Sequence, residues 1–542
     1  MLNLTLPATN RFASEYMEQS SDILPFFHYQ YQDAESYEQR LVELNNRSFF
    51  RKELAQHITR YMEPFPTSQQ VENSLQKLKH EDSVVVIGGQ QAGIITGPLY
   101  TIHKVISIIV FAQQKERELG VPVVPVFWIA GEDHDYIEVN HIYSEINDTI
   151  EKFTYPEVVQ GKKMISDICI NKLECFSWVK EIIEMYGETE HTNQLLQFAN
   201  QAIERSNTMV DFFSHIIMKL FKEFGLLIID SGDKQLRTLE QSFLIRQLKE
   251  FRKITKSVFK QQQELNQAGY SKALDINENA VNIFYYDELS QSRILLEYHA
   301  ETETFIGKNS QVRFSFEQLY KLVREQPEKF SNNVVTRPLT QEWLFPTLAF
   351  IAGPGEIAYW SELKQVFEHF DLKMPPIVPR LNITLLERSI ETDLQELGFG
   401  LEEVIREGIS TQKAKFMSAV MDQELLDLFN QMKQDVTAKY QIIASKSVEI
   451  DRGLLPLVEK NEQFLQKQIQ FIEQKIEGAI EQKHSVTLKK MERVKNALRP
   501  NGSPQERILN PVYFLNKYGL DFAKRLTSLN YQFDGSHKVI KL

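Results

Sequence analysis

The sequence has few cysteines, no long apolar run and no excess of basic residues. Its two cysteines, Cys169 and Cys175, are too few for a disulfide framework or a cysteine zinc site, which favours a reducing compartment. No run approaches the roughly 20 apolar residues of a membrane helix, and the first residues lack the pattern of a signal peptide. Acidic residues outnumber basic ones, 73 to 61, so the net charge of −12 disfavours nucleic acid and anionic membranes. We expect a cytoplasmic protein with no nucleic-acid or membrane partner.

What is present is the composition of a large globular protein. Hydrophobic residues make up 42% and charged residues 25% of the 542 positions, which are ordinary values for folded chains. A single core rarely grows beyond roughly 250–300 residues, so the length predicts two to four structural units.

Short, apolar, β-branched runs followed by glycine or polar residues are typical of buried parallel strands. Such runs occupy residues 83–87, 121–130, 225–230, 347–353 and 376–379. A helical pattern over 99–119 joins the first two runs into a βαβ unit. The sequence therefore predicts an α/β fold with a Rossmann-like, doubly wound parallel sheet. The long gaps at about 143–222 and 233–333 predict two inserted subdomains, the second with antiparallel strands near 281–285, 292–298 and 303–306.

The remaining segments flank this core of residues 83–384. Residues 1–82 are predicted to be a packed N-terminal lead-in with a helical stretch over about 35–61. Apolar residues alternate at steps of four and three within 385–499, which predicts two long antiparallel helices with a turn near 444–453. This coiled-coil arm favours a homodimer, although packing of the two helices within one chain would also bury its apolar residues. Residues 500–542 are a tail that could fold back over the sheet.

The loop after the first strand has glycines at 88, 89, 93 and 97 and leads into a helix, where backbone N–H groups favour an anion. It is neither a dinucleotide-binding fingerprint nor a P-loop. Gly97, Leu99, Tyr100 and His103 resemble the HIGH signature of class I aminoacyl-tRNA synthetases and pantothenate synthetases. His103 is then a candidate catalytic residue, and its alternative is a helix-side histidine with one satisfied hydrogen bond. The other candidates are Gly89, Gly93, Thr96 and Gly97 for nucleotide phosphates, and Gln90, Gln91 and Tyr100 for substrate.

Carboxylates and imidazoles crowd the end of the second strand, from Glu132 to His141. Such a cluster could hold a divalent cation, orient an amine or supply a general base, and a solvated acidic loop is the alternative. Its candidates are Asp133, His134 and Asp135 for catalysis, and Glu132 and Asn140 for substrate binding.

Two further stretches carry arginines suited to carboxylate or phosphate groups. Arg337 precedes the fourth strand, Glu356 and Tyr359 follow it, and Arg380 follows the fifth. All four are candidate substrate-binding residues. No G-x-S-x-G or H-E-x-x-H motif is present, and neither cysteine has a histidine nearby, so a covalent nucleophile is not supported.

Four stretches together resemble the bacillithiol biosynthesis cysteine-adding enzyme family. They are GGQQAGIITGPLYTIHK, WIAGEDHDYIEVNH, RPLTQEWLFPTLAFIAGPGEIAYW and PNGSPQER. The resemblance covers essentially the whole chain. It implies a Rossmann core with two connecting-peptide insertions, and a coiled coil that mediates dimerisation.

The resemblance also implies a ligase that joins cysteine to the amine of glucosaminyl malate, the last step in making bacillithiol. It implies an adenine nucleotide as a ligand. We expect ATP or ADP, with Mg²⁺ as a possible companion, and assign no residue as a metal ligand. From the HIGH-like stretch we predict an acyl-adenylate, with Arg337 and Arg380 holding substrate carboxylates. Two alternatives remain: a metal-dependent hydrolase built on residues 132–141, and a non-catalytic nucleotide-binding scaffold.

Overall fold

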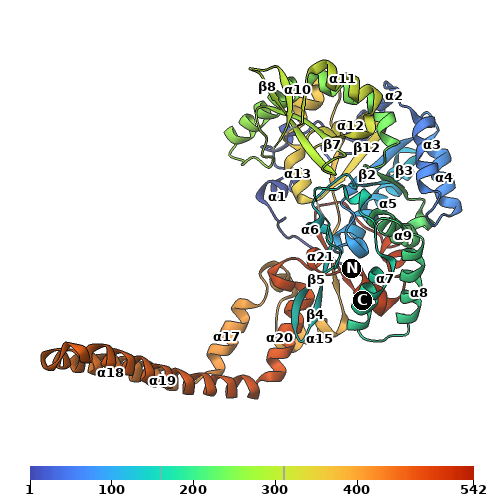
Figure 1. Ribbon diagram of the computed structural model, residues 1–542. Helices are drawn as coiled ribbons and strands as arrows, with labels where there is room; N and C mark the ends of the chain where they lie inside the picture. The colour runs from blue at the N-terminus through green and yellow to red at the C-terminus, as the bar shows by residue number, and fades with distance from the viewer. Residues whose placement is uncertain (160, 309–311) are drawn as a thin grey trace. The chain divides into compact units, whose positions relative to one another are not determined.

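Figure 1 shows the computed structural model of the chain, which describes residues 1–159, 161–308 and 312–542. These residues form two compact units. Unit 1 comprises Met1–Ile146, Glu151–Thr384 and Glu506–Ile540. Unit 2 comprises Asn147–Ile150, Leu385–Gln505 and Lys541–Leu542. The chain therefore leaves unit 1 after Thr384 and re-enters it at Glu506.

A five-stranded parallel sheet forms the centre of unit 1, in the order β13-β12-β2-β3-β6. Its strands are β2 (Val84–Gln90), β3 (Val123–Ile129), β6 (Leu227–Asp230), β12 (Thr347–Ala352) and β13 (Ile377–Pro379). Every residue of β3, β6 and β12 is buried, as expected for apolar strands covered on both faces. The predicted strands and the Rossmann-like fold class are confirmed.

The order of the strands indicates where a ligand site should lie. Helix α5 (Tyr100–Leu119) connects β2 to β3, and it ends at Gly120 in the left-handed conformation that glycine favours. β3 lies on one side of β2, and β12 lies on the other. In open α/β sheets, ligands bind beyond the carboxyl ends of the strands at such a change of direction. The relevant ends here are Gln90 and Ala352.

The segment between β3 and β6 is mainly helical. Its elements are α6 (Tyr136–Val139), β4 (His141–Ile146), β5 (Thr149–Thr154), α7 (Lys172–Met185), α8 (Thr192–Glu204) and α9 (Met209–Phe221). Both cysteines are free thiols, with Cys175 buried in α7 and Cys169 exposed.

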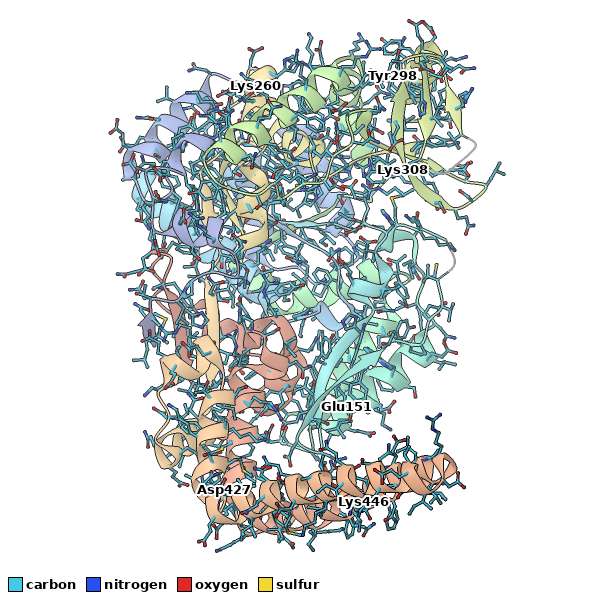
Figure 2. All side chains as sticks on the ribbon, turned by 90° about the vertical axis from the view of Figure 1, so that its left-hand side faces the viewer. Glu151, Lys260, Tyr298, Lys308, Asp427 and Lys446 are labelled. Carbon is cyan, nitrogen blue, oxygen red and sulfur yellow. The ribbon has the colours of Figure 1, made fainter. Side chains whose placement is uncertain are left out.

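The segment between β6 and β12 contains an antiparallel sheet in the order β10-β9-β8-β7-β11. Its elements are α10 (Leu236–Gln267), β7 (Ala280–Asp287), β8 (Ser292–His299), β9 (Thr304–Gly307), β10 (Arg313–Phe314), α11 (Phe316–Glu325) and β11 (Phe330–Asn332). Leu248 and Phe251 of α10 share a core with Val281 and Leu296 of the sheet. In Figure 2, Lys260 marks α10 and Tyr298 marks β8. The three predicted strands are present, and the short β10 and β11 extend the sheet.

The N-terminal region differs from the sequence prediction at one point. It contains α1 (Arg11–Met17), α2 (Ala34–Asn45), α3 (Arg51–Met62) and α4 (Gln69–Leu78). The prediction of one helical stretch over 35–61 is therefore wrong, since α2 and α3 are separate. The break includes Asn46 and Ser48, whose side chains compete for backbone hydrogen bonds and disfavour helix interiors.

The remaining elements lie next to the last strands of the parallel sheet in sequence, or in the segment by which the chain re-enters unit 1. Three helices precede or follow β12: α12 (Thr336–Leu344), α13 (Pro354–Trp360) and α14 (Lys364–His369). The returning chain forms α21 (Gln505–Ile508), α22 (Pro511–Tyr518) and α23 (Phe522–Thr527). A small sheet has the order β1-β15-β14, from β1 (Leu2–Leu4), β15 (His537–Lys541) and β14 (Asn382–Leu386).

Unit 2 is helical and is dominated by an antiparallel pair of long helices, on which Asp427 and Lys446 are labelled in Figure 2. Its helices are α15 (Arg388–Leu397), α16 (Leu401–Glu407), α17 (Ser410–Val420), α18 (Gln423–Ile450), α19 (Leu455–Lys483) and α20 (Ser485–Leu498). Phe429 of α18 and Ile469 of α19 are buried, and Lys433 pairs with Glu473 across the two helices. The predicted coiled coil is confirmed, but the turn predicted near 444–453 lies at 451–454, because α18 continues to Ile450. None of the helices in the described ranges has the length and apolar character to cross a membrane.

Candidate active site

A cavity of about 400 Å³ lies at the carboxyl ends of the parallel strands, where the strand order predicts a ligand site. Gly89 and Gln90 of β2, Trp128 of β3 and the Gly353–Glu356 turn after β12 all contribute to its wall. The predicted site residues that line it are Gly89, Gln90, Gln91, Tyr100, Asp133, Arg337, Glu356, Tyr359 and Arg380. Residues from three distant parts of the sequence thus meet at one edge of the sheet.

Lys104 is a cavity residue that the sequence prediction did not include. Its ammonium group donates a hydrogen bond of 2.6 Å to the carbonyl of Gly89 and pairs with Glu356 at 2.5 Å. Burial lowers its pKa, and the Glu356 carboxylate opposes that effect. Glu356 also accepts a hydrogen bond of 2.6 Å from the N–H of Gly353. The positive charge of Lys104 is therefore largely balanced within the protein.

Arg380 is also balanced, by a glutamate that the sequence prediction did not include. Its two terminal nitrogens donate to Glu506 at 2.8 and 2.6 Å, and both side chains are almost fully buried. Burial alone would raise the pKa of Glu506, but the charge of Arg380 and the hydrogen bonds from His103 and Arg380 hold it well below its ordinary value. The carboxyl group is thus ionised, and it neutralises the guanidinium group.

His103, the candidate catalytic residue of the HIGH-like stretch, does not line this cavity. It is fully buried, and its Nδ1 lies 2.9 Å from the carboxylate of Glu506. Burial lowers the pKa of His103, which favours a neutral ring whose Nδ1–H donates to Glu506. Tyr100 and Lys104 are four residues apart and share the cavity face of α5, whereas His103 lies about 100° around the helix from Lys104.

The acidic cluster after β3 is dispersed by the fold, and only Asp133 reaches this cavity. Its Oδ2 accepts a hydrogen bond of 2.6 Å from Gln91, and its Oδ1 accepts one of 2.7 Å from the N–H of His134. Glu132 turns away and forms a buried ion pair with Arg237.

The other members of the cluster also lie elsewhere. The His134 ring stands edge-on to Phe284, and burial together with the nearby Arg293 lowers its pKa. Asp135 is exposed, and Asn140 is buried and lines neither cavity. In the part of the chain that the structure describes, no three His, Cys, Asp or Glu side chains form a group that could hold a metal ion.

A second cavity of about 220 Å³ contains the glycine-rich loop and shares Gln91, Tyr100 and Arg507 with the first. Gly93 and Gly97 line it, and a Cβ on Gly93 would lie only 2.8 Å from the Cα of Gly97. Thr96 has a φ of 68° and is buried away from both cavities. The N–H groups of Gly93 and Gly97 already donate to loop carbonyls, so they are not an open phosphate cradle.

Arg337 and Arg507 give the first cavity its uncompensated positive charge. Arg337 donates hydrogen bonds to the neutral groups of Gln341, at 3.1 Å, and Tyr359, at 2.9 Å. Arg507 is exposed at the cavity wall. Within the described ranges neither arginine forms an ion pair with a carboxylate. The arrangement suits a small ligand that carries negative charge together with a group that Asp133 could bind.

Comparison with known proteins gives full-length matches. Residues 1–381 match the family model described as "Bacillithiol biosynthesis BshC, N-terminal Rossmann-like domain", and residues 383–542 match "Bacillithiol biosynthesis BshC, C-terminal coiled-coil domain". Relatives named "Putative cysteine ligase BshC" include one from Geobacillus sp. (strain WCH70), 43% identical over 99% of both chains. Another, from Geobacillus thermodenitrificans, is 42% identical over 99% of this chain and 98% of its own. A third, from Anoxybacillus flavithermus, is 40% identical over the whole of both chains.

Proposed function

The chain belongs to the bacillithiol biosynthesis BshC family, and from that premise we propose that it is a ligase joining the carboxyl group of cysteine to the amine of glucosaminyl malate. The observation that carries the proposal is the cavity beyond β2, β3 and β12, where Arg337 and Arg507 have no carboxylate partner among the described residues and Asp133 faces the same space. An acceptor with a malyl dicarboxylate and an amine is complementary to that set of charges.

The anionic end of the acceptor lies at Arg337 in this proposal. The hydrogen bonds to Gln341 and Tyr359 fix the guanidinium group without neutralising it. Its remaining N–H groups can therefore donate to a carboxylate of the malyl group, and a guanidinium group suits that planar geometry. Arg380, which the sequence also predicted for this role, is already committed to Glu506.

The amine of the acceptor lies at Asp133 in this proposal. An amine must lose a proton before it attacks an activated carboxyl group, so the site needs a base within hydrogen-bond reach. Gln91 and the N–H of His134 hold the Asp133 carboxylate in one orientation. Glu356 is less suited to this role because its carboxylate is engaged by Lys104 and Gly353.

Forming an amide from a carboxylate and an amine is uphill in water, so we infer that ATP is a co-substrate. We propose that a carboxylate oxygen of cysteine attacks the α-phosphorus of ATP and that pyrophosphate leaves, with Mg²⁺ as the counter-ion of the phosphates. The second cavity adjoins the first and is lined by Gly93 and Gly97 of the glycine-rich loop. The N–H groups of these glycines already donate hydrogen bonds to carbonyls of the loop. Cationic side chains must therefore neutralise the negative charge of the phosphates.

The test is a reaction of purified protein with ATP, cysteine and glucosaminyl malate, followed by mass spectrometry. We expect the cysteine amide, together with cysteine-dependent exchange of pyrophosphate into ATP. Asp133→Asn should lower the rate about 100-fold or more, the usual size of a general-base contribution. Asp275→Asn is the matched control, because Asp275 is an exposed aspartate that pairs with Lys272 outside the cavity.

Three other results would each contradict one part of the proposal. Absence of the amide with the wild-type protein would contradict the ligase proposal. Release of ADP in place of pyrophosphate would replace the adenylate with an acyl phosphate. Unchanged thiol levels in cells that carry Asp133→Asn would favour a non-catalytic scaffold.

We also propose a homodimer that assembles through unit 2. The α18–α19 pair exposes large apolar side chains, among them Met432, Ile443, Phe464 and Ile472, each with more than two fifths of its surface accessible. A second copy of the coiled coil would cover these side chains. Light scattering of the Phe464→Ser variant beside the wild type tests this, and two monomeric samples would contradict it.

A further inference from the structure

The first residues of the returning chain, 506–510, are fixed to the sheet region at both ends of this short stretch. At one end the Glu506 carboxylate binds Arg380 and His103. At the other end the Asn510 side chain donates to the carbonyls of Ile95 at 3.0 Å and Gly97 at 2.7 Å. These buried contacts hold the backbone of the intervening residues at the rim of both cavities.

Arg507 lies between these anchors, and its side chain differs from those of its neighbours. It is exposed, whereas Glu506 and Asn510 are buried, and it lines both cavities. It forms no ion pair with a carboxylate of the described chain. A fixed backbone with an unpaired cationic side chain is preorganised for a ligand, because little backbone freedom is lost on binding.

The charges of the first cavity leave a role for a second cation. Of its four cations, Lys104 is balanced by Glu356 and Arg380 by Glu506. Among the described residues of the cavity wall, Arg337 and Arg507 are the cations that remain to bind a ligand with two carboxylates. If Arg337 binds one carboxylate of the malyl group, the other needs a cation in the same cavity, and Arg507 is the one that the protein has not neutralised.

We propose that Arg507 is a substrate-binding residue that takes the second carboxylate of the malyl group opposite Arg337. This inference rests on the proposed ligase function for the identity of the substrate. It assigns to the returning chain a direct part in recognition of the acceptor.

The experiment measures calorimetric binding of L-malate, the dicarboxylate part of the acceptor, and the KM values for glucosaminyl malate and cysteine. The variants are Arg507→Gln and Arg507→Lys. The matched control is Arg525→Gln, an exposed arginine of α23 that pairs with Asp521 outside both cavities. Because Arg507 is exposed, its variants should keep the wild-type melting temperature.

We expect Arg507→Gln to weaken malate binding and raise the KM for glucosaminyl malate by about 10- to 100-fold, the usual worth of one charged hydrogen-bonding group. The KM for cysteine should stay unchanged. Arg507→Lys should lose less than Arg507→Gln, because it keeps the charge but not the planar fork. Arg525→Gln should behave as wild type.

The outcomes separate the two proposals. Wild-type malate binding by Arg507→Gln, in a protein whose wild type makes the cysteine amide, would overturn the role of Arg507 and leave the ligase function standing. A wild-type protein that makes no amide would overturn the ligase function, while loss of malate binding in Arg507→Gln would still support a carboxylate contact. An equal rise in the KM for cysteine would overturn the assignment to the malyl end.

Discussion

Replacement of Glu506 by glutamine should destabilise unit 1, because it removes the negative member of a buried ionic group. Arg380 loses a charged partner that accepts at 2.8 and 2.6 Å, and His103 loses the one at 2.9 Å. Glutamine keeps the size of the side chain, so the change is one of charge and hydrogen bonding with little change in packing.

The magnitude follows from the burial of Arg380, which is 6% exposed. Removing one partner of a buried ion pair costs about 3–5 kcal/mol, since the other charge stays poorly hydrated. Arg380 borders a cavity that water can enter, so we expect about 3 kcal/mol, at the lower end of that range. Glu506→Gln combined with Arg380→Gln removes both charges, and it should be more stable than Glu506→Gln alone.

The assay is urea unfolding followed by tryptophan fluorescence. All four tryptophans, Trp128, Trp178, Trp343 and Trp360, lie in unit 1, so the signal reports that unit alone. Glu81→Gln, at an exposed carboxylate before β2, is the control. A Glu506→Gln transition within 0.5 kcal/mol of wild type, or a double variant that shows the full sum of both single losses, would refute the reasoning.

Three further predictions use the same unfolding and activity assays. The folded-state pKa of Glu506 lies below its ordinary value of 4.5, so its stabilising contribution should be present above pH 4.5 and be lost as the pH falls through the lower folded value; a Glu506→Gln difference that persists undiminished into strong acid would contradict this. Burial raises the pKa of Asp230 from 3.8 to about 7, so stability should decline as the pH rises between those values, and Asp230→Asn should abolish that decline when thermal unfolding at pH 5 and pH 8 is compared. Gly353→Ala places a methyl group 3.7 Å from Nε of Arg380 and 3.4 Å from Glu356, at a backbone φ of −79° that alanine tolerates. The variant should raise the KM for the acceptor several-fold and keep the wild-type stability. A fall in its unfolding midpoint would contradict this prediction.

The sheet could be predicted from the sequence because each strand is a short apolar run that ends in glycine or polar residues. Local composition carries that information, as in the run from Val123 to Ile129. The antiparallel strands of the second insertion were predictable for the same reason. The break between α2 and α3 was missed, although Asn46 and Ser48 mark it.

The candidate site was predictable in its location but less so in its contacts. Tyr100, His103 and Lys104 all lie within the first turns of one helix, so spacing alone does not say which of them faces a ligand. The answer depends on Glu506, which is 403 positions from His103 and covers that side of the helix. Arg507 ends PNGSPQER, one of the four stretches that carry the family resemblance, but nothing local marks it as a cavity residue, because only the folded path of the returning chain brings it there.

The separation of Glu506 and Arg507 from the rest of the cavity affects the order in which the protein can mature during synthesis. A ribosome that has translated residues 1–505, which include the parallel sheet and the long helices of unit 2, has not yet supplied the carboxylate that neutralises Arg380. Nascent chains that stop before residue 506 would therefore carry an unbalanced buried arginine and an incomplete pocket. Such fragments should be inactive and prone to degradation, so the cell would not accumulate a partly working enzyme.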